Sequence, residues 1–65
     1  MIVLHRLNGK EFILNCELVK YVESIPDTLL TLTTDDKIMV KETVPEVIDA
    51  IRKYKKEIFQ FGLKV

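Results

Sequence analysis

Short apolar stretches separated by polar turns occupy most of this chain, and a helical spacing follows. Residues 1–7, MIVLHRL, are rich in aliphatic and β-branched side chains and end at Asn8-Gly9. Asn-Gly between apolar runs is the strongest short hairpin signal, because both central residues of a type I′ turn need positive φ. In the returning residues 10–15, Phe12 and Leu14 share one face. The pattern predicts a hairpin closed by a type I′ turn.

The segment after this hairpin predicts a second pair of strands. Residues 17–25, ELVKYVESI, lack clean alternation, so we expect a strand preceded by a kink or helical turn near residues 16–19. Pro26 presets φ for a turn and cannot donate a ladder hydrogen bond, and Asp27 tolerates the next turn position. The chain therefore turns there, before a strand in which Leu30 and Leu32 share a face.

A further turn and a change of period complete the pattern. Asp35-Asp36 predicts a turn into residues 37–42, where Ile38 and Val40 lie on one side. From Thr43 onward the spacing is helical: a capping box is followed by apolar residues at steps of three and four. The apolar positions are Val44, Val47, Ile48, Ile51, Tyr54 and Ile58. Gly62 is a natural helix stop.

These elements predict a single α+β domain over residues 1–65, a small and mostly antiparallel β-meander of about five strands with one C-terminal α-helix. A chain of this size buries little of its surface and commonly needs a disulfide, a metal ion or a partner subunit. Cys16 is the only cysteine and His5 the only histidine, so an internal disulfide and an ordinary zinc site are excluded. A partner is the remaining source of stability.

The end of the helix is the expected place for that partner. A helix over residues 44–61 would span about 27 Å, whereas a six-residue strand spans about 20 Å. The overhang, together with one residue just beyond it, carries four large apolar side chains, which would form an unusually large exposed patch on a small monomer. They are Ile58, Phe59, Phe61 and Leu63. We expect this segment to pack on a second copy of the chain; the alternative is a bend that folds it over the sheet edge.

Charge and hydropathy along the chain restrict the binding partners and the cellular location that we expect for the protein. Ten basic residues balance ten acidic ones, and this zero net charge argues against strong non-specific binding to DNA. The apolar N-terminal run stops at Leu4, far short of a signal-peptide core or a membrane span. We expect a soluble cytoplasmic protein with no membrane insertion.

No catalytic constellation is visible, so we expect no enzymatic activity, no cofactor and no bound metal. His5 and Cys16 could meet across the first hairpin, but each is also explained as an ordinary strand residue and a small apolar filler. The acidic residues Asp27, Asp35 and Asp36 fall in predicted turns. The two glycines lie far apart, so no phosphate-binding loop is formed.

One basic cluster remains, on the later part of the predicted helix. Its members are Arg52, Lys53, Lys55 and Lys56. Such a cluster can contact nucleic acid, anionic lipid or an acidic protein surface, or it can simply be the solvated face of a helix. No platform of several aromatic side chains that could stack on bases is evident beside this cluster, which weakens the hypothesis that it binds nucleic acid.

The chain resembles the small flagellar proteins of the FlbD family, called SwrD in some bacteria, from its N-terminus to about Ile58. The segments that carry the likeness are Leu7-Asn8-Gly9, Phe12, Leu14-Asn15, Glu23, Pro26-Asp27-Thr28 and Val40-Lys41-Glu42. Family members often have glycine in the turn that Asp35-Asp36 occupies here, and either residue type supports a tight turn.

The resemblance implies a cytoplasmic accessory of flagellar motility, linked to motor power in swarming cells and without known catalytic residues. It makes an exposed turn the candidate contact for a partner at the flagellar motor or its assembly. The residues of that candidate contact are Glu23, Pro26, Asp27 and Thr28. An equally open interpretation is that the Pro-Asp-Thr triplet only forms the turn of the hairpin and binds no partner.

The alternative function is a small nucleic-acid-binding regulator of motility genes. The opening residues look superficially like those of CsrA-type RNA-binding proteins, with Arg6 near their basic position. That likeness fades after the second strand, and the basic motif of their last strand is missing. The layout also resembles LytTR-type DNA-binding domains, but only as an analogy of fold.

Overall fold

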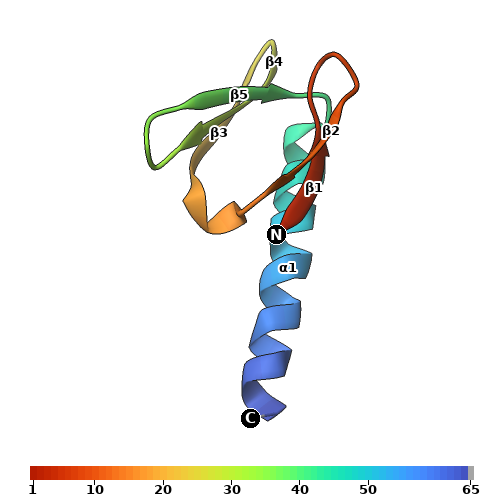
Figure 1. The fold of residues 1–65 in the computed structure, drawn as a ribbon, viewed down its shortest axis with the longest axis vertical. Coiled ribbons are helices and arrows are strands. Elements are labelled where there is room, and N and C mark those ends of the chain that lie inside the picture. The colour runs from red at the N-terminus through yellow and green to blue at the C-terminus, as the bar shows by residue number, and fades with distance from the viewer. Residues whose placement is uncertain (65) are drawn as a thin grey trace.

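The computed structural model (Figure 1) describes the backbone of residues 1–64 and the side chains of residues 1–58. Within these residues it has two antiparallel sheets and one long C-terminal helix, α1 (Val44–Lys64). The first sheet is a hairpin of β1 (Ile2–His5) and β2 (Glu11–Leu14). The second has the order β3-β4-β5, formed by β3 (Val19–Ile25), β4 (Asp27–Leu32) and β5 (Lys37–Val40). The predicted α+β class, with about five strands and a C-terminal helix, is confirmed.

The turn between β1 and β2 differs from the predicted type I′ turn. The Gly9 N–H donates to the Arg6 carbonyl and the Arg6 N–H to the Lys10 carbonyl, each at 2.8 Å. Gly9 has a φ of 89°, whereas Asn8 is not among the described residues with positive φ. The connection is therefore a three-residue loop in which the glycine alone is left-handed. Asn8 acts through its side chain, since its Oδ1 accepts a hydrogen bond from the Lys10 N–H at 2.9 Å.

The other turns form where the sequence predicts them. A 3₁₀ turn, η1 (Cys16–Leu18), precedes β3, and the Asn15 side chain caps it by accepting from the Glu17 N–H. Pro26 alone separates β3 from β4, so this turn is shorter than predicted and Asp27, expected in the turn, begins β4. Asp35, with a φ of 71°, occupies the left-handed region in the turn before β5. Aspartate tolerates this region better than most residues, which explains the absence of glycine there.

The two sheets are joined at the end of β1 and the end of β5. Arg6 forms an antiparallel bridge with Val40, and the Lys41 N–H donates to the His5 carbonyl at 2.9 Å. The first half of α1 packs where the sheets meet, while its second half extends beyond them (Figure 1). Each of β1, β4, β5 and α1 contributes one fully buried side chain to the core. These are Leu4, Leu30, Val40 and Val47.

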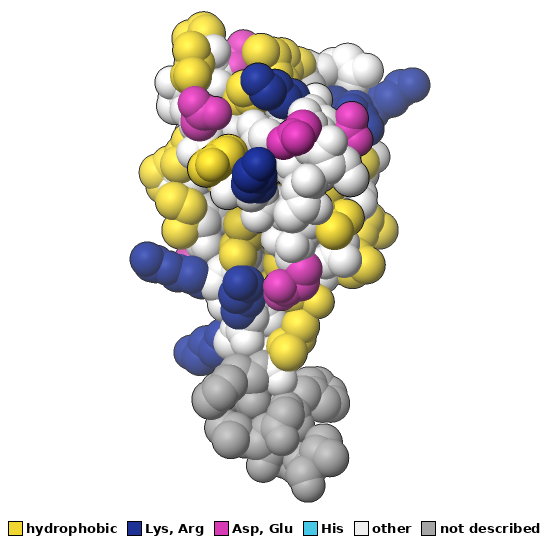
Figure 2. Space-filling view, turned by 90° about the vertical axis from the view of Figure 1, so that its left-hand side faces the viewer, with side chains coloured by type: hydrophobic (Ala, Val, Ile, Leu, Met, Phe, Trp, Pro, Cys, Tyr) yellow, Lys and Arg dark blue, Asp and Glu magenta, His cyan; other side chains and the backbone are white. Residues whose placement is uncertain are grey.

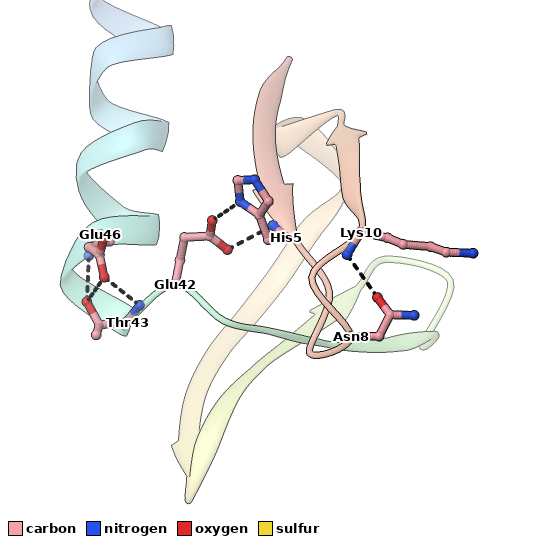
Figure 3. A network of polar contacts seen from close by, with 6 residues as sticks. All are labelled: His5, Asn8, Lys10, Glu42, Thr43 and Glu46. Atoms are coloured by element: carbon pink, nitrogen blue, oxygen red, sulfur yellow. Dashed lines mark hydrogen bonds and ion pairs between the residues drawn. The ribbon is translucent and has the colours of Figure 1, made fainter.

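The start of α1 is the predicted capping box. The Glu46 N–H donates to the Thr43 hydroxyl at 3.3 Å, and the Thr43 N–H donates to a Glu46 carboxylate oxygen at 3.0 Å (Figure 3). The predicted stop at Gly62 is wrong, because the helix continues to Lys64. A glycine inside a helix costs about 1 kcal/mol relative to alanine, which weakens a helix without ending it.

Candidate partner-binding site

An open groove of about 570 Å³ lies where the β3–β4 turn approaches the start of α1. Three segments line it: the β3–β4 turn, the junction between β5 and α1, and the first hairpin loop. The lining residues are Leu7, Ser24, Pro26, Asp27, Thr28, Val40, Lys41, Thr43, Val44 and Pro45. Its volume falls within the range of about 300–1,000 Å³ that is common for ligand sites.

Local sequence determines each wall of the groove. Pro26 ends β3 because it has no N–H for the ladder. Thr28 and Val40 are paired across β4 and β5 and retain 6% and 1% of their exposure, so they form the buried base of the groove. On the other side, Thr43 caps α1, and Pro45 occupies the first helical turn without loss of a hydrogen bond.

The lining combines apolar side chains with charges of both signs. Leu7 is 46% exposed, and the groove also contains Pro26 and Val44. The carboxylate of Asp27 and the ammonium of Lys41 make no ion pair within the described part of the chain. Both charges are therefore available to a partner, and the groove can hold an apolar side chain beside polar groups.

The His5–Glu42 contact fixes the groove wall that contains Lys41 and Thr43. The His5 N–H donates to Glu42 Oε1 at 2.9 Å, and His5 Nδ1 lies 2.6 Å from Glu42 Oε2 (Figure 3). Partial burial by itself raises the pKa of Glu42, but the hydrogen bonds from the side chain and backbone of His5 outweigh it. The net result is a pKa of the Glu42 carboxyl below its usual 4.5. This contact holds the segment before α1 against β1.

The structure separates two residues that the sequence left as a possible pair. His5 contacts Glu42, whereas Cys16 is 4% exposed and belongs to the apolar core. The interpretation of Cys16 as an apolar filler agrees with this position. Within the described residues, no group of three or more His, Cys, Asp and Glu side chains is arranged to hold a metal ion.

The predicted contact residues all lie on the β3–β4 hairpin. Pro26, Asp27 and Thr28 line the groove, while Glu23 lies outside it on β3. Glu23, Pro26 and Asp27 are exposed, and Thr28 is buried at the base. Their role as a partner contact stays a prediction.

The remaining groove residues belong to no sequence pattern that places them beside this turn. Leu7, Lys41 and Val44 come from segments distant in sequence and are brought to the turn by the fold. One sequence feature points to part of this neighbourhood. The predicted strand after Pro26 and the next predicted strand should pair, and this pairing brings residues 40 and 41 close to the turn at Pro26.

The other predicted sites lie on α1. The four residues of the basic cluster are exposed, and Lys53 pairs with Asp49 at 3.1 Å on the same helix. Ile58 is 49% exposed and belongs to the second half of α1 (Val44–Lys64), the half that extends beyond the sheets in Figure 1. The other predicted self-association residues, Phe59, Phe61 and Leu63, lie outside the residues whose side chains are described. No helix of residues 1–64 is long and apolar enough to span a membrane.

The comparisons with known proteins identify the class of this chain as flagellar and swarming motility proteins, because residues 1–59 match the model of one family of that description. The match covers most of the chain. The chain therefore belongs to the FlbD family, and the resemblance seen in its sequence is confirmed. No curated protein and no solved structure matches it.

Proposed function

We propose that this chain is a non-enzymatic accessory of flagellar motility that binds a protein of the flagellar motor or its assembly. Membership of the FlbD family supports the role in motility. The groove supports the mode of action, because its lining contains Pro26-Asp27-Thr28 and Val40-Lys41, two segments by which the chain resembles that family. A solvent-open groove with apolar walls and unpaired charges suits a protein segment better than an enclosed small molecule.

Self-association and location complete the proposal. A second copy of the chain packs on the far half of α1, where Ile58 is exposed. The assembly acts in the cytoplasm and is recruited to the base of the flagellum. The groove lies at the opposite end of the helix, beside its capping box, so a partner and a second copy can bind at the same time.

The alternative is a small nucleic-acid-binding regulator of motility genes. Its support is the exposed basic cluster of α1, although Lys53 in that cluster already pairs with Asp49. A gel-shift series against salt separates the two functions, since nucleic-acid binding weakens steeply as salt rises.

The decisive experiment combines motility with partner capture in the native host. The gene is deleted and complemented by the wild type, by Leu7→Glu in the groove, or by Ile13→Glu as a matched control. Leu7 is 46% exposed and Ile13 is 68% exposed on the outer face of the first hairpin, so both substitutions add a charge at an exposed apolar position. Swarming, filament number, flagellar transcripts and cross-linked flagellar proteins are measured together.

We expect Leu7→Glu to lose swarming and the cross-linked flagellar protein while transcripts stay unchanged, and Ile13→Glu to behave as the wild type. Full motility and full cross-linking with folded Leu7→Glu would refute the groove as the contact. Changed flagellar transcripts together with salt-sensitive RNA or DNA binding would favour the regulator.

A further inference from the structure

Strand β3 has one unpaired edge. In the order β3-β4-β5, β4 pairs on both sides, whereas β3 pairs with β4 alone within residues 1–64. The backbone N–H and C=O groups along the other side of such a strand are a template for an added strand.

The register shows which groups face outward. The Leu32 N–H donates to the Asp36 carbonyl at 2.8 Å, so the alternation of an antiparallel ladder directs Leu30 toward β5 and Leu29 and Thr31 toward β3. Leu29 pairs with Glu23 and Thr31 with Tyr21. The intervening residues of β3, at positions 22 and 24, therefore direct their backbone groups away from β4.

Both ends of β3 are protected against strand addition, but its middle is not. At the start, the register is irregular between Val19 and Tyr21, and Lys20 adds a charge. At the end, Pro26 stops the strand. Bulges, lysines and prolines are the devices by which sheets protect their edges. Between them, the pairing from Tyr21↔Thr31 to Ile25↔Asp27 is regular, so residues 21–25 form an unprotected window.

The side chains of this window define the chemistry of a fitting strand. On the outer face of the sheet Tyr21 is 57% and Ile25 is 60% exposed, with the exposed Glu23 between them. Glu23 makes no ion pair in the described part of the chain. Figure 2 shows the side of the molecule that lies on the left in Figure 1, and hydrophobic side chains are interspersed there with charged ones. The window therefore presents an apolar, an acidic and an apolar position in turn.

We propose that β3 binds a strand of its flagellar partner along residues 21–25, with a Lys or Arg opposite Glu23 and apolar residues opposite Tyr21 and Ile25. This inference rests on the proposed function, which supplies a protein partner. Cross-strand pairs of opposite charge and of apolar side chains stabilise such an arrangement. Ser24 lies in the window and also lines the groove, so the added strand reaches the groove at the hairpin tip.

A second copy of the chain fits the window less well than a basic strand. A two-fold antiparallel pairing of β3 with itself, centred on Glu23, places two carboxylates opposite one another, and like charges in that position are destabilising. Charge complementarity at Glu23 thus favours a different, basic partner.

The test uses the full ¹⁵N-labelled chain and the synthetic peptide acetyl-Thr-Ile-Thr-Lys-Val-Leu-Thr-amide, whose Lys falls opposite Glu23. Two control peptides isolate the causes: one replaces the Lys by Glu, and one is N-methylated at the residues that supply hydrogen bonds to positions 22 and 24. We expect saturable slowing of amide hydrogen exchange at Val22 and Ser24 with the first peptide. Binding should be about tenfold weaker with the Glu peptide and lost with the N-methylated one.

A chain variant provides the reciprocal control. Glu23→Lys reverses the charge of the window, so it should prefer the Glu peptide over the Lys peptide. Equal binding of the N-methylated peptide, or no protection of Val22 and Ser24 at millimolar peptide, would overturn strand addition. Protection that grows with chain concentration in the absence of peptide would show that a second copy occupies the edge, and would also overturn it. Each negative result leaves the cross-linking and swarming measurements unaffected, so failure here is distinguishable from failure of the proposed function.

Discussion

His5 and Glu42 are 37 positions apart in sequence, yet both carboxylate oxygens of Glu42 contact His5. Oε1 accepts a hydrogen bond from the backbone N–H of His5, and Oε2 lies beside the ring nitrogen Nδ1. The Glu42 side chain is only 18% exposed, so these contacts are partly shielded from water. The pair connects the last residue of β1 to the segment that leads into α1, and it holds one wall of the groove in place.

Glu42→Gln should destabilise the fold at neutral pH. Hydrogen bonds to a charged group contribute about 1.5–3 kcal/mol, and the substitution removes the charge. Because the pKa of Glu42 is lowered in the folded state, its contribution is present above the usual value of 4.5 and is lost as pH falls below it. The gap between wild type and variant in urea denaturation should therefore be full at pH 7 and close as the pH falls through the acidic range below 4.5.

Glu17→Gln provides the control for this pH series, because Glu17 is exposed and makes no ion pair in the described residues. Its stability should follow that of the wild type at every pH. A gap for Glu42→Gln that stayed constant with pH would show that shape, and not ionisation, underlies the effect.

Thr43→Ala should lower the free energy of unfolding by about 1 kcal/mol, because it removes the side-chain half of the capping box. Thr43→Ser keeps the hydroxyl and should restore most of the loss. Helical circular dichroism during urea denaturation measures both variants. Equal stability of the alanine and serine variants would mean that the capping bonds contribute nothing.

Leu4→Ala should destabilise the chain by about 2–5 kcal/mol, because the leucine is fully buried in the apolar core to which β2, β4, β5 and α1 also contribute. In a domain of this size such a loss can unfold most of the protein. The neighbouring Val3 is 50% exposed, and Val3→Ala should change stability by no more than about 0.5 kcal/mol. Similar effects of the two substitutions would contradict the observed orientation of β1, in which Leu4 is buried and Val3 is exposed.

Asp35→Gly should be more stable than Asp35→Ala by about 1 kcal/mol, since alanine is disfavoured at a φ of 71° and glycine is not. Both substitutions remove the carboxylate near Lys20, so that exposed contact cancels in the comparison. At Asp36, which does not have positive φ, the order should reverse. Thermal denaturation of the four variants tests this pattern.

Ile58→Glu should prevent the proposed self-association, because it places a charge on the exposed part of α1. Sedimentation should show an oligomer for the wild type and a 7.6 kDa monomer for the variant. Lys56→Glu, a charge reversal two residues away, should leave the oligomer intact. A monomeric wild type at micromolar concentration would refute self-association.

Local chemistry accounts for the parts of the fold that the sequence predicts well. The capping box, the turn at Pro26 and the helical turn before β3 each depend on neighbouring residues, and all are observed. The burial of Leu30 and Val40 on the core side of their strands also follows from the alternation of side chains along a β-strand.

The failures have physical reasons that involve competing interactions. The loop at Asn8 differs from the predicted type I′ turn, because the hydrogen bond from the Lys10 N–H to the Asn8 side chain stabilises a longer loop than an Asn-Gly pair usually forms. The His5–Glu42 contact and the groove join segments far apart in sequence, and the spacing of apolar residues within one strand or helix does not show which distant segments meet. The groove therefore required the tertiary structure, although one of its walls was recognisable as a turn.

The position of Leu4 in the core has a consequence for how the chain folds during synthesis. β1 is made before the other elements of the fold, but the apolar core that contains Leu4 also contains Val40 and Val47, which are made later. The hairpin of β1 and β2 and the three strands β3, β4 and β5 need only short loops to pair, whereas the burial of Leu4 must await β5 and α1. The earliest strand of the fold is thus among the last to have its side chains buried, and until then its aliphatic residues are available to chaperones.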